Sequence, residues 1–142
     1  MPFTPLVDAS VDTVVSTFTV CTIPGVLEAI RSIGRVLKPG GLMMTSTTSI
    51  TDSPELAHVW QRERTTFDAE EAPEIVARHF EEVELDRWDG PYVRLPDQAA
   101  LRDYLVGRLM PRDEATKAAQ QIETPLDVTK RGVMIFARRL RI

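Results

Sequence analysis

Few side chains in this sequence have the types and spacing that acid–base or nucleophilic catalysis requires. The two histidines, His58 and His79, have no acidic residue at a spacing that would hold an imidazole for proton transfer, so we expect both to be structural or solvated. Asp8 and Asp12 resemble a carboxylate pair, but Asp12 marks the entrance of an apolar run. Cys21 is the single cysteine, which excludes an intramolecular disulfide and a cysteine-based zinc site. The residues therefore predict neither a fixed catalytic group nor a metal centre.

The elements that would position a site begin with an uncharged run rich in β-branched residues. Residues 12–20, Asp-Thr-Val-Val-Ser-Thr-Phe-Thr-Val, predict a central parallel strand that is buried on both faces. Apolar residues recur at helical spacing over 26–37, and Lys-Pro-Gly-Gly at 38–41 stops that helix. A second uncharged run over 42–47 predicts another buried strand. A strand, a helix and a strand of this kind form a βαβ unit, so the pattern predicts an open α/β sheet.

The rest of the chain adds helices and two more strands. The alternating run over 80–88 predicts an edge strand with one wet face, which Asp-Gly-Pro at 89–91 would end. The apolar run over 132–137 should insert between that strand and the second one. The predicted helices cover residues 54–64, 68–79 after a cap at Asp68, 97–109 after a cap at Asp97, and 111–122. We expect a single domain over 1–142 with a helical insertion over 97–123.

The composition is that of a soluble globular chain. The 142 residues include 43% hydrophobic and 27% charged side chains, and the formal net charge is -4, so no overall positive field would attract nucleic acid or anionic lipid. The sequence does not open with a secretory signal, and no uncharged stretch reaches the ~20 apolar residues of a spanning helix. We therefore expect a cytoplasmic protein with no nucleic-acid or membrane partner. Arg138, Arg139 and Arg141 should form a solvated tail.

A series of short motifs in a fixed order covers nearly the whole sequence. The motifs are Met1-Pro2-Phe3, Asp8 to Asp12, Val14 to Phe18, Ile23-Pro24, Arg35 to Gly41, Phe80 to Leu85, Pro96-Asp97 and Gly132 to Ala137. This series resembles the carboxyl-terminal half of the type 11 family of class I S-adenosylmethionine-dependent methyltransferases, with Met1 and Val11 in place of a leucine and a phenylalanine. The resemblance implies an α/β, partial Rossmann-like sheet with flanking helices, in which the family's strands follow the order 4, 5, 7, 6 and strand 7 is antiparallel.

Two parts of the family's cofactor site have no counterpart in the sequence. The family has a glycine-rich turn after its first strand and an acid after its second strand, whereas the one adjacent glycine pair here, Gly40-Gly41, belongs to a different turn. Met1 takes an internal position of a family motif. On this basis we expect that the sequence begins at an internal methionine or in a truncated reading frame, or is completed by another chain, and that it is inactive alone.

The predicted sheet places a ligand site at the end of its first strand. In open α/β sheets ligands bind beyond the carboxyl ends of the parallel strands, which brings Ser16, Thr17, Phe18 and the turn through Cys21 to the site. The resemblance implies S-adenosyl-L-methionine as the cofactor, with Ser16, Thr17 and Cys21 on the cofactor side. The alternative is that Thr17 is an ordinary β-branched strand residue and Cys21 a small buried apolar one.

The acceptor of the methyl group is not readable from the residues. By resemblance, Phe18, Trp60 and Tyr92 would lie toward a small-molecule substrate, while ordinary packing is the alternative for the aromatic residues. We expect methyl transfer to a small molecule. The alternative function is a non-catalytic binding or oligomerisation module, because the strand over 12–20 normally pairs with a strand that is not present here, and an unpaired apolar edge invites self-association.

Overall fold

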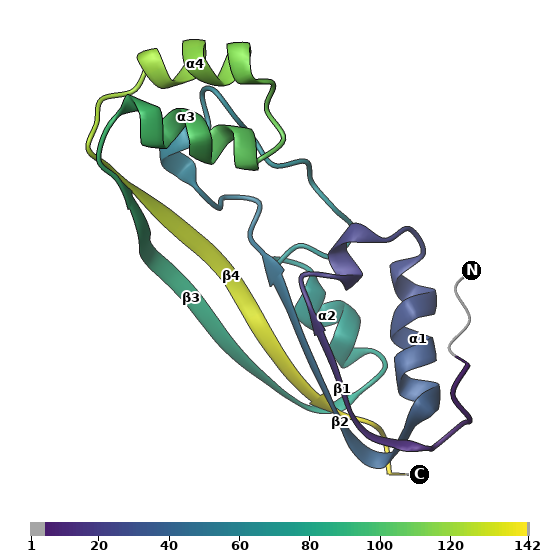
Figure 1. Ribbon diagram of the computed structural model, residues 1–142. Helices are drawn as coiled ribbons and strands as arrows, with labels where there is room; N and C mark the ends of the chain where they lie inside the picture. The colour runs from purple at the N-terminus through teal and green to yellow at the C-terminus, as the bar shows by residue number, and fades with distance from the viewer. Residues whose placement is uncertain (1–4, 142) are drawn as a thin grey trace. The chain divides into compact units, whose positions relative to one another are not determined.

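The computed structural model describes residues 5–141, so the Met1-Pro2-Phe3 motif lies outside the described residues. Strands and helices alternate along much of the chain, which confirms the predicted α/β class (Figure 1). The strands are β1 Val11–Thr17, β2 Leu37–Thr48, β3 Glu81–Leu95 and β4 Leu126–Arg138. The helices are α1 Val26–Val36, α2 Ala72–Ala77, α3 Gln98–Gly107 and α4 Arg112–Gln120, with short 3₁₀ helices at Val20–Thr22 and Pro54–Leu56.

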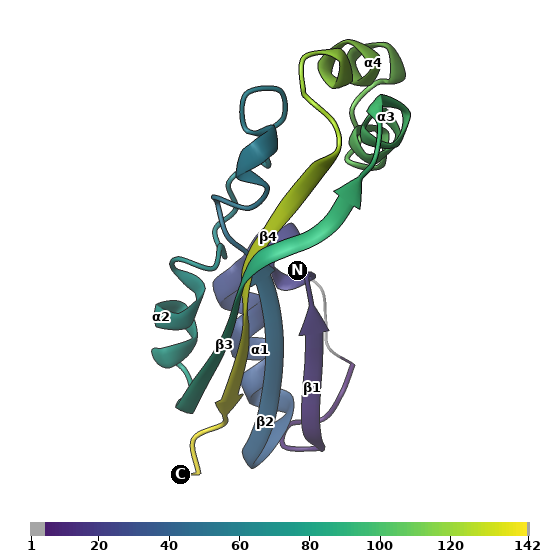
Figure 2. The ribbon, with the colours of Figure 1, turned by 90° about the vertical axis from the view of Figure 1, so that its left-hand side faces the viewer.

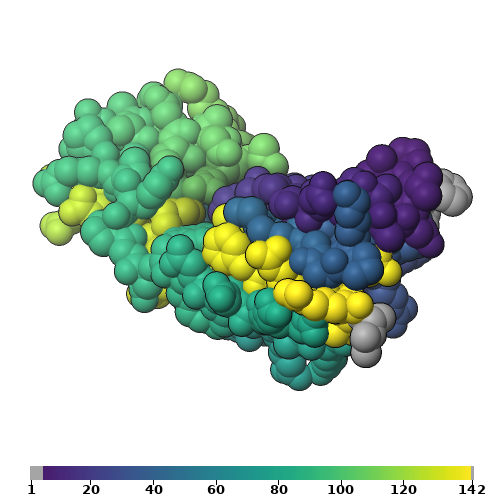
Figure 3. All heavy atoms as spheres, turned by 90° about the horizontal axis from the view of Figure 1, so that it is seen from below, coloured from purple at the N-terminus to yellow at the C-terminus, as the bar shows by residue number. Residues whose placement is uncertain are grey.

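The four strands form one mixed sheet in the order β1-β2-β4-β3. β1 and β2 are parallel, and β2 and β4 are antiparallel. Seen from below in Figure 3, the yellow residues near the chain end lie between the blue residues of β2 and the teal residues of β3, as this order requires. The predicted insertion of the last strand beside the second, and its antiparallel direction, are both confirmed.

Contacts within the chain define two compact units. Unit 1 consists of Met1–Ile50, Glu63–Trp88 and Arg131–Ile142, and unit 2 of Thr51–Arg62 and Asp89–Lys130. The helices α3 and α4, which fall in the predicted insertion over 97–123, lie in unit 2. The assignment of a single domain to 1–142 stays a prediction.

Helices cover one face of the sheet in unit 1, which we call the covered face. Residues two apart along a strand share a face, and Met43, Thr45 and Thr47 of β2 lie on this one. The covered face joins one apolar cluster with Ile30 of α1 and Val76 of α2, whose side chains are fully buried. α1 forms because its apolar residues recur at helical spacing, after Gly25 has reversed the chain with a φ of 74°.

The other face of the sheet in unit 1 carries apolar residues that no helix of that unit covers, and we call it the open face. In Figure 2, α1 lies behind the strands. Val15, Met44 and Phe136 lie side by side across β1, β2 and β4 on the open face. Val15 is 61% exposed, and Met44 and Phe136 are only half-buried.

Unit 2 packs α3 and α4 around a second apolar cluster. Leu101 and Leu105 of α3 are fully buried there, together with Ala115 of α4. Asp97 caps α3, since its carboxylate accepts a hydrogen bond of 2.8 Å from the Ala100 N–H, and this confirms the predicted cap. Pro111 precedes α4, in agreement with the helix predicted from that position.

The first strand differs from its prediction. We predicted a central strand over 12–20 buried on both faces, but β1 lies at one edge of the described sheet and is exposed along much of its length. It also ends at Thr17, because Phe18 adopts a φ of 53° and turns the chain. An uncharged run of β-branched residues predicts a strand with apolar faces. Whether that strand is central or at an edge depends on which strands lie beside it.

The third strand is longer than predicted. The Asp-Gly-Pro sequence at 89–91 was expected to end it near Trp88, yet β3 continues through these residues to Leu95. β3 is the other edge of the sheet, where a proline can be tolerated because one row of backbone groups forms no ladder bond. The position of β3 at the edge of the sheet therefore allows the strand to continue through a sequence that usually forms a turn.

Two predicted helices are shorter than expected. Only the 3₁₀ helix Pro54–Leu56 forms within 54–64, and α2 begins at Ala72 rather than at Asp68. The Asp68 carboxylate is fully buried and accepts hydrogen bonds from the Thr65 N–H (3.1 Å) and hydroxyl (3.0 Å), so it closes the preceding turn instead of capping the helix. Asp68 was correctly predicted to bond to nearby backbone, but it does so in the turn before α2 and not at the first residue of that helix.

The arginines near the chain end form the expected solvated tail only in part, because Arg139 is half-buried whereas Arg141 is exposed. Arg139 donates hydrogen bonds to the backbone carbonyls of Arg35 (3.3 Å) and Leu37, where α1 ends. Arg141 forms an ion pair of 3.5 Å with Glu82 at the start of β3. The Arg139 contacts add a cation to the carbonyl groups at the carboxyl end of α1, where the helix dipole favours positive charge. Within residues 5–141, no helix has both the length and the apolar character that crossing a bilayer requires.

Candidate functional site

The carboxyl end of β1 is fixed by backbone hydrogen bonds to β2. The Phe18 N–H donates to the Ser46 carbonyl (3.1 Å) and lies 3.3 Å from the Ser46 hydroxyl oxygen. The Thr19 hydroxyl donates to the Thr17 carbonyl at 3.0 Å, and Val20 anchors the following 3₁₀ helix in the core. Phe18 adopts its positive φ at this point, a conformation that costs a non-glycine residue about 1 kcal/mol. The turn beyond the strand is thus held in one place.

The three residues expected on the cofactor side do not point in one direction. Ser16 lies opposite Thr45 on the covered face, whereas Thr17 lies opposite Ser46 on the open face and is exposed. Cys21 is half-buried against the apolar cluster of the covered face, as the alternative interpretation of a small apolar residue describes. Thr17 is therefore the member of this set whose side chain is accessible to a ligand on the open face.

An aromatic pair that the sequence did not indicate lies beside this strand end. Phe18 and Trp88 form an edge-to-face contact with ring centroids 6.1 Å apart and an interplanar angle of 71°. Gly132 allows Trp88 to lie against β4, because a Cβ at Gly132 would be 2.3 Å from the Trp88 ring and 2.6 Å from the Thr47 carbonyl oxygen. Phe18 is 49% exposed, so its ring forms part of the surface next to Thr17. Gly132, a glycine inside a buried strand, is the feature of the sequence that could have indicated this close approach.

The carboxyl end of β2 is held by the segment before α2. Ala69 donates its N–H to the Thr48 carbonyl at 3.0 Å. Glu70 accepts hydrogen bonds from the Ser49 hydroxyl and from the Ile50 N–H, the latter at 3.2 Å. These contacts lie within unit 1, and they give the Glu70 carboxylate a structural role at the end of β2. Glu70 is the acid that the structure places at this strand end.

The other acids considered from the sequence have structural partners. Asp8 pairs with Arg35, and Asp12 pairs with Lys38 at 3.0 Å, at the amino end of β1. Asp12 therefore lies at the amino end of β1, away from the predicted ligand site at the carboxyl end, as expected. Across residues 5–141, no group of three or more histidine, cysteine, aspartate or glutamate side chains is arranged to hold a metal ion.

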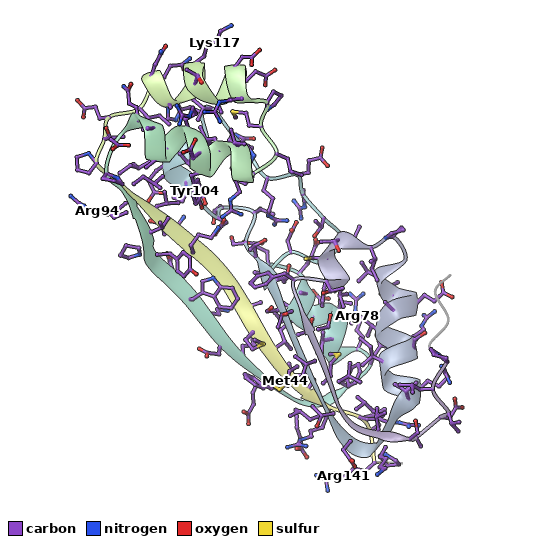
Figure 4. The ribbon with its side chains drawn as sticks, viewed as in Figure 1. Met44, Arg78, Arg94, Tyr104, Lys117 and Arg141 are labelled. Atoms are coloured by element: carbon purple, nitrogen blue, oxygen red, sulfur yellow. The ribbon has the colours of Figure 1, made fainter. Side chains whose placement is uncertain are left out.

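The aromatic residues predicted to face the substrate belong to unit 2. Tyr92 on β3 is 79% exposed. Trp60 is half-buried against the second apolar cluster, and the guanidinium carbon of Arg108 lies 5.8 Å from the centre of its ring. Tyr104, labelled on α3 in Figure 4, flanks the same guanidinium at 4.9 Å. Trp60 was predicted from the sequence as a site residue, whereas Tyr104 and Arg108 were not, because the three side chains meet only in the folded unit.

The end of β1 is the place where the sequence predicts a cofactor such as S-adenosyl-L-methionine. Thr17 and the Phe18 ring are accessible, but the Phe18 N–H is already bonded to β2 and the nearby Glu70 is engaged by Ser49 and Ile50. Within residues 5–141 no free acid or glycine-rich turn stands at this edge. The described residues alone do not make a whole site for this cofactor.

The order of the strands, with the last one antiparallel, is that of the class I methyltransferase fold, and the chain has this fold. A family model described as a methyltransferase domain matches residues 2–45, which hold β1, α1 and most of β2. This match confirms the resemblance to methyltransferases over these residues, whereas the assignment to the carboxyl-terminal half of the family stays a prediction. A sequence search of curated proteins returns no match.

Solved structures with the same fold are distant in sequence. The YcgJ protein of Bacillus subtilis is 15% identical with a TM-score of 0.60, and the match covers 97% of this chain and 67% of that one. A SAM-dependent methyltransferase of Archaeoglobus fulgidus is 12% identical, with a TM-score of 0.53 and coverages of 94% and 61%. Phosphoethanolamine N-methyltransferase 2 of Haemonchus contortus, in complex with phosphomonomethylethanolamine and S-adenosylhomocysteine, is 16% identical, with a TM-score of 0.53 and coverages of 95% and 34%. The chain thus spans between about a third and two thirds of these proteins.

Proposed function

We propose that this chain takes part in S-adenosylmethionine-dependent methyl transfer to a small-molecule acceptor, as one portion of a catalytic domain. The observation that carries the proposal is the class I sheet order together with the family match over residues 2–45. The cofactor would supply an activated methyl group for in-line displacement, so the protein's task is to hold the two reactants in position. No acid–base residue is needed for that task.

In this proposal the end of β1 forms one wall of the cofactor site. Thr17 contacts the cofactor from the open face, and the rigid turn at Phe18 sets the position of the wall. Ser16 and Cys21 act from behind this wall, since one points to the covered face and the other packs in the core. Trp60 and Tyr92 remain candidates for contacts with the acceptor.

The remaining wall would come from polypeptide that supplies a glycine-rich turn and an acid. The open face supports this part of the proposal, because its apolar residues in β1, β2 and β4 resemble those of a sheet that is covered on both faces. Translation of the coding sequence upstream of Met1 tests it directly. An in-frame glycine-rich turn is expected there or in a partner gene, and its absence from both would contradict a completed enzyme.

Isothermal titration calorimetry with S-adenosylmethionine tests whether the chain is a complete cofactor-binding unit. We expect no heat of binding at micromolar cofactor, because the described residues provide only part of the site. A chain extended by the missing elements should bind, and Thr17→Val in that extended chain should weaken binding by about 1 kcal/mol if the hydroxyl donates to or accepts from the cofactor. Micromolar binding by the present chain alone would refute the claim of an incomplete site.

The second candidate function is a non-catalytic binding or oligomerisation module derived from the same fold. The exposed edge strand favours it: β1 has a neighbour on one side only in the described sheet, and Val15 is 61% exposed. Such an edge is a template for pairing with another strand. The two functions separate in the calorimetry of the extended chain, which should bind cofactor if it is an enzyme and should not if it is an assembly module.

A further inference from the structure

We propose that unit 2 carries a binding site for the oxyanion of a small molecule, a carboxylate or a phosphate, built around Arg108. The site stands on unit 2 alone and does not depend on methyl transfer. Arg108 follows directly on the last residue of α3, and its guanidinium contacts two aromatic rings, 4.9 Å from the centre of Tyr104 and 5.8 Å from that of Trp60.

The charge of Arg108 has no counter-ion among the described residues. Two other cations of unit 2 do have a counter-ion: Arg94 pairs with Asp127 at 3.0 Å, and Lys130 pairs with Asp52 at 2.5 Å. Arg108 instead contacts the rings and donates one hydrogen bond of 2.7 Å to the Tyr104 hydroxyl. A guanidinium offers five N–H donors, so most of its donors remain available, and the half-buried side chain leaves them in reach of solvent.

The hydroxyl of Tyr104 adds a second donor at the same place. Since its oxygen accepts a hydrogen bond from Arg108, its own O–H is free to donate to a bound anion. A guanidinium and a phenol that converge in this way can form charge-assisted hydrogen bonds to one carboxylate or phosphate group. Contacts with two aromatic rings limit the rotation of the guanidinium, which lowers the entropy lost when an anion binds.

The rings themselves are held by buried contacts of unit 2. Tyr104 sits on α3 and packs against the second apolar cluster. Trp60 follows the 3₁₀ helix Pro54–Leu56, and its backbone N–H donates to the Leu56 carbonyl at 2.7 Å. That segment is tied to β4, because the Glu55 carboxylate accepts a hydrogen bond of 3.1 Å from the Thr129 N–H. The two rings thus form a fixed platform rather than two mobile surface groups.

The test follows the indole N–H signals of the two tryptophans by NMR while inorganic phosphate replaces chloride at constant ionic strength. Substitution Trp60→Phe assigns the two signals. We expect the Trp60 signal to shift and saturate, with a dissociation constant of about 1–10 mM, while the Trp88 signal of unit 1 stays in place. A second titration with acetate shows whether the site accepts a planar carboxylate as well as a tetrahedral phosphate.

Variants separate binding from packing. Arg108→Gln should weaken phosphate binding at least about 10-fold, and Arg108→Lys should weaken it by about 5-fold because a lysine lacks the planar fork. The matched control is Arg102→Gln on the same helix, whose guanidinium already donates to Asp103 at 2.9 Å and lowers the pKa of that carboxyl, so phosphate binding should change less than about 2-fold.

Three results would overturn the proposal. They are a Trp60 signal that does not move or that shifts linearly without saturation, an equal loss of binding in Arg102→Gln, and undiminished binding in Arg108→Gln. If Arg108→Gln unfolds unit 2, Arg108→Lys decides, because it keeps the cation and the packing of the stem. Full phosphate affinity in a folded Arg108→Lys variant then counts against a guanidinium-specific site.

Discussion

The covered and open faces of the sheet in unit 1 carry similar apolar side chains but differ in burial. Ile135 on the covered face is completely buried, whereas its sequence neighbour Phe136 on the open face is only half-buried. The same contrast separates Met43 from Met44 in β2. Both faces have the composition of a buried strand, and helices cover one of them. Burial of a side chain in this sheet therefore depends on whether a helix covers its face. The apolar composition of the strand alone does not predict which face is buried.

The largest expected effect comes from the centre of the covered face. Ile135→Ala should lower the free energy of unfolding by about 4 kcal/mol, since it leaves a cavity among fully buried neighbours. Chemical denaturation with urea measures this change. The matched control is Phe136→Ala on the open face, for which we expect less than about 1.5 kcal/mol even though more atoms are removed. Equal losses at the two positions would mean that the open face is covered in solution.

The close approach of β3 to β4 should tolerate no added atom on the open face. Gly132→Ala places a Cβ 2.3 Å from the Trp88 ring and 2.6 Å from the Thr47 carbonyl oxygen, so the strands or the ring must shift. We expect a loss of about 3 kcal/mol in the free energy of unfolding, measured by thermal or urea denaturation. Gly90→Ala, where a Cβ would meet nothing within 4 Å, is the control and should change stability by less than about 0.5 kcal/mol. A tolerated Gly132→Ala would show that the two strands lie further apart.

Buried hydroxyls on the covered face give a smaller effect of opposite sign. The Thr47 Oγ1 is buried without a hydrogen-bond partner among the described residues. Thr47→Val should therefore raise the free energy of unfolding by about 1 kcal/mol, because it removes an unsatisfied polar group without changing the shape of the side chain. Thr13→Val at an exposed position of β1 is the control, with no change expected beyond about 0.3 kcal/mol. Destabilisation by Thr47→Val would reveal a partner such as a buried water.

The smallest effect on stability, but a clear one on assembly, is expected at the exposed edge. The chain should self-associate through residues 12–20, and Val15→Lys should suppress this because a charge on an edge strand opposes pairing with another strand. The free energy of unfolding per chain should change by less than about 0.5 kcal/mol. Sedimentation velocity measures the assembly state of both proteins. A monodisperse monomer of the unsubstituted chain would contradict self-association at this edge.

Much of the fold could be predicted from local patterns. The apolar spacing over 26–37 predicted α1, and Asp97 predicted a cap. The residues at 42–47 and 132–137 predicted the second halves of β2 and β4. These predictions rest on periodicity and on side-chain hydrogen bonds within a few residues, which the sequence contains directly. The order of the strands followed from the family motifs.

The candidate sites depended more on tertiary structure. The end of β1 was predicted as a ligand edge, but the opposite orientations of Ser16 and Thr17 relative to the helices became clear only when the covered face was known. Arg108 was not singled out at all. Its role comes from two aromatic rings contributed by segments more than forty positions apart in the sequence, Trp60 and Tyr104.

The sequence by itself determined the α/β class, the approximate positions of β2 and β4, the extent of α1 and the start of α3, because these depend on short-range periodicity and capping. The tertiary structure decided that β1 is an edge of the described sheet, that β3 runs through Asp-Gly-Pro at 89–91, and that the guanidinium of Arg108 meets two rings. Each of these outcomes depends on which strand or side chain lies next to a residue in space. Such neighbours are set by the packing of the whole unit, which no local pattern contains.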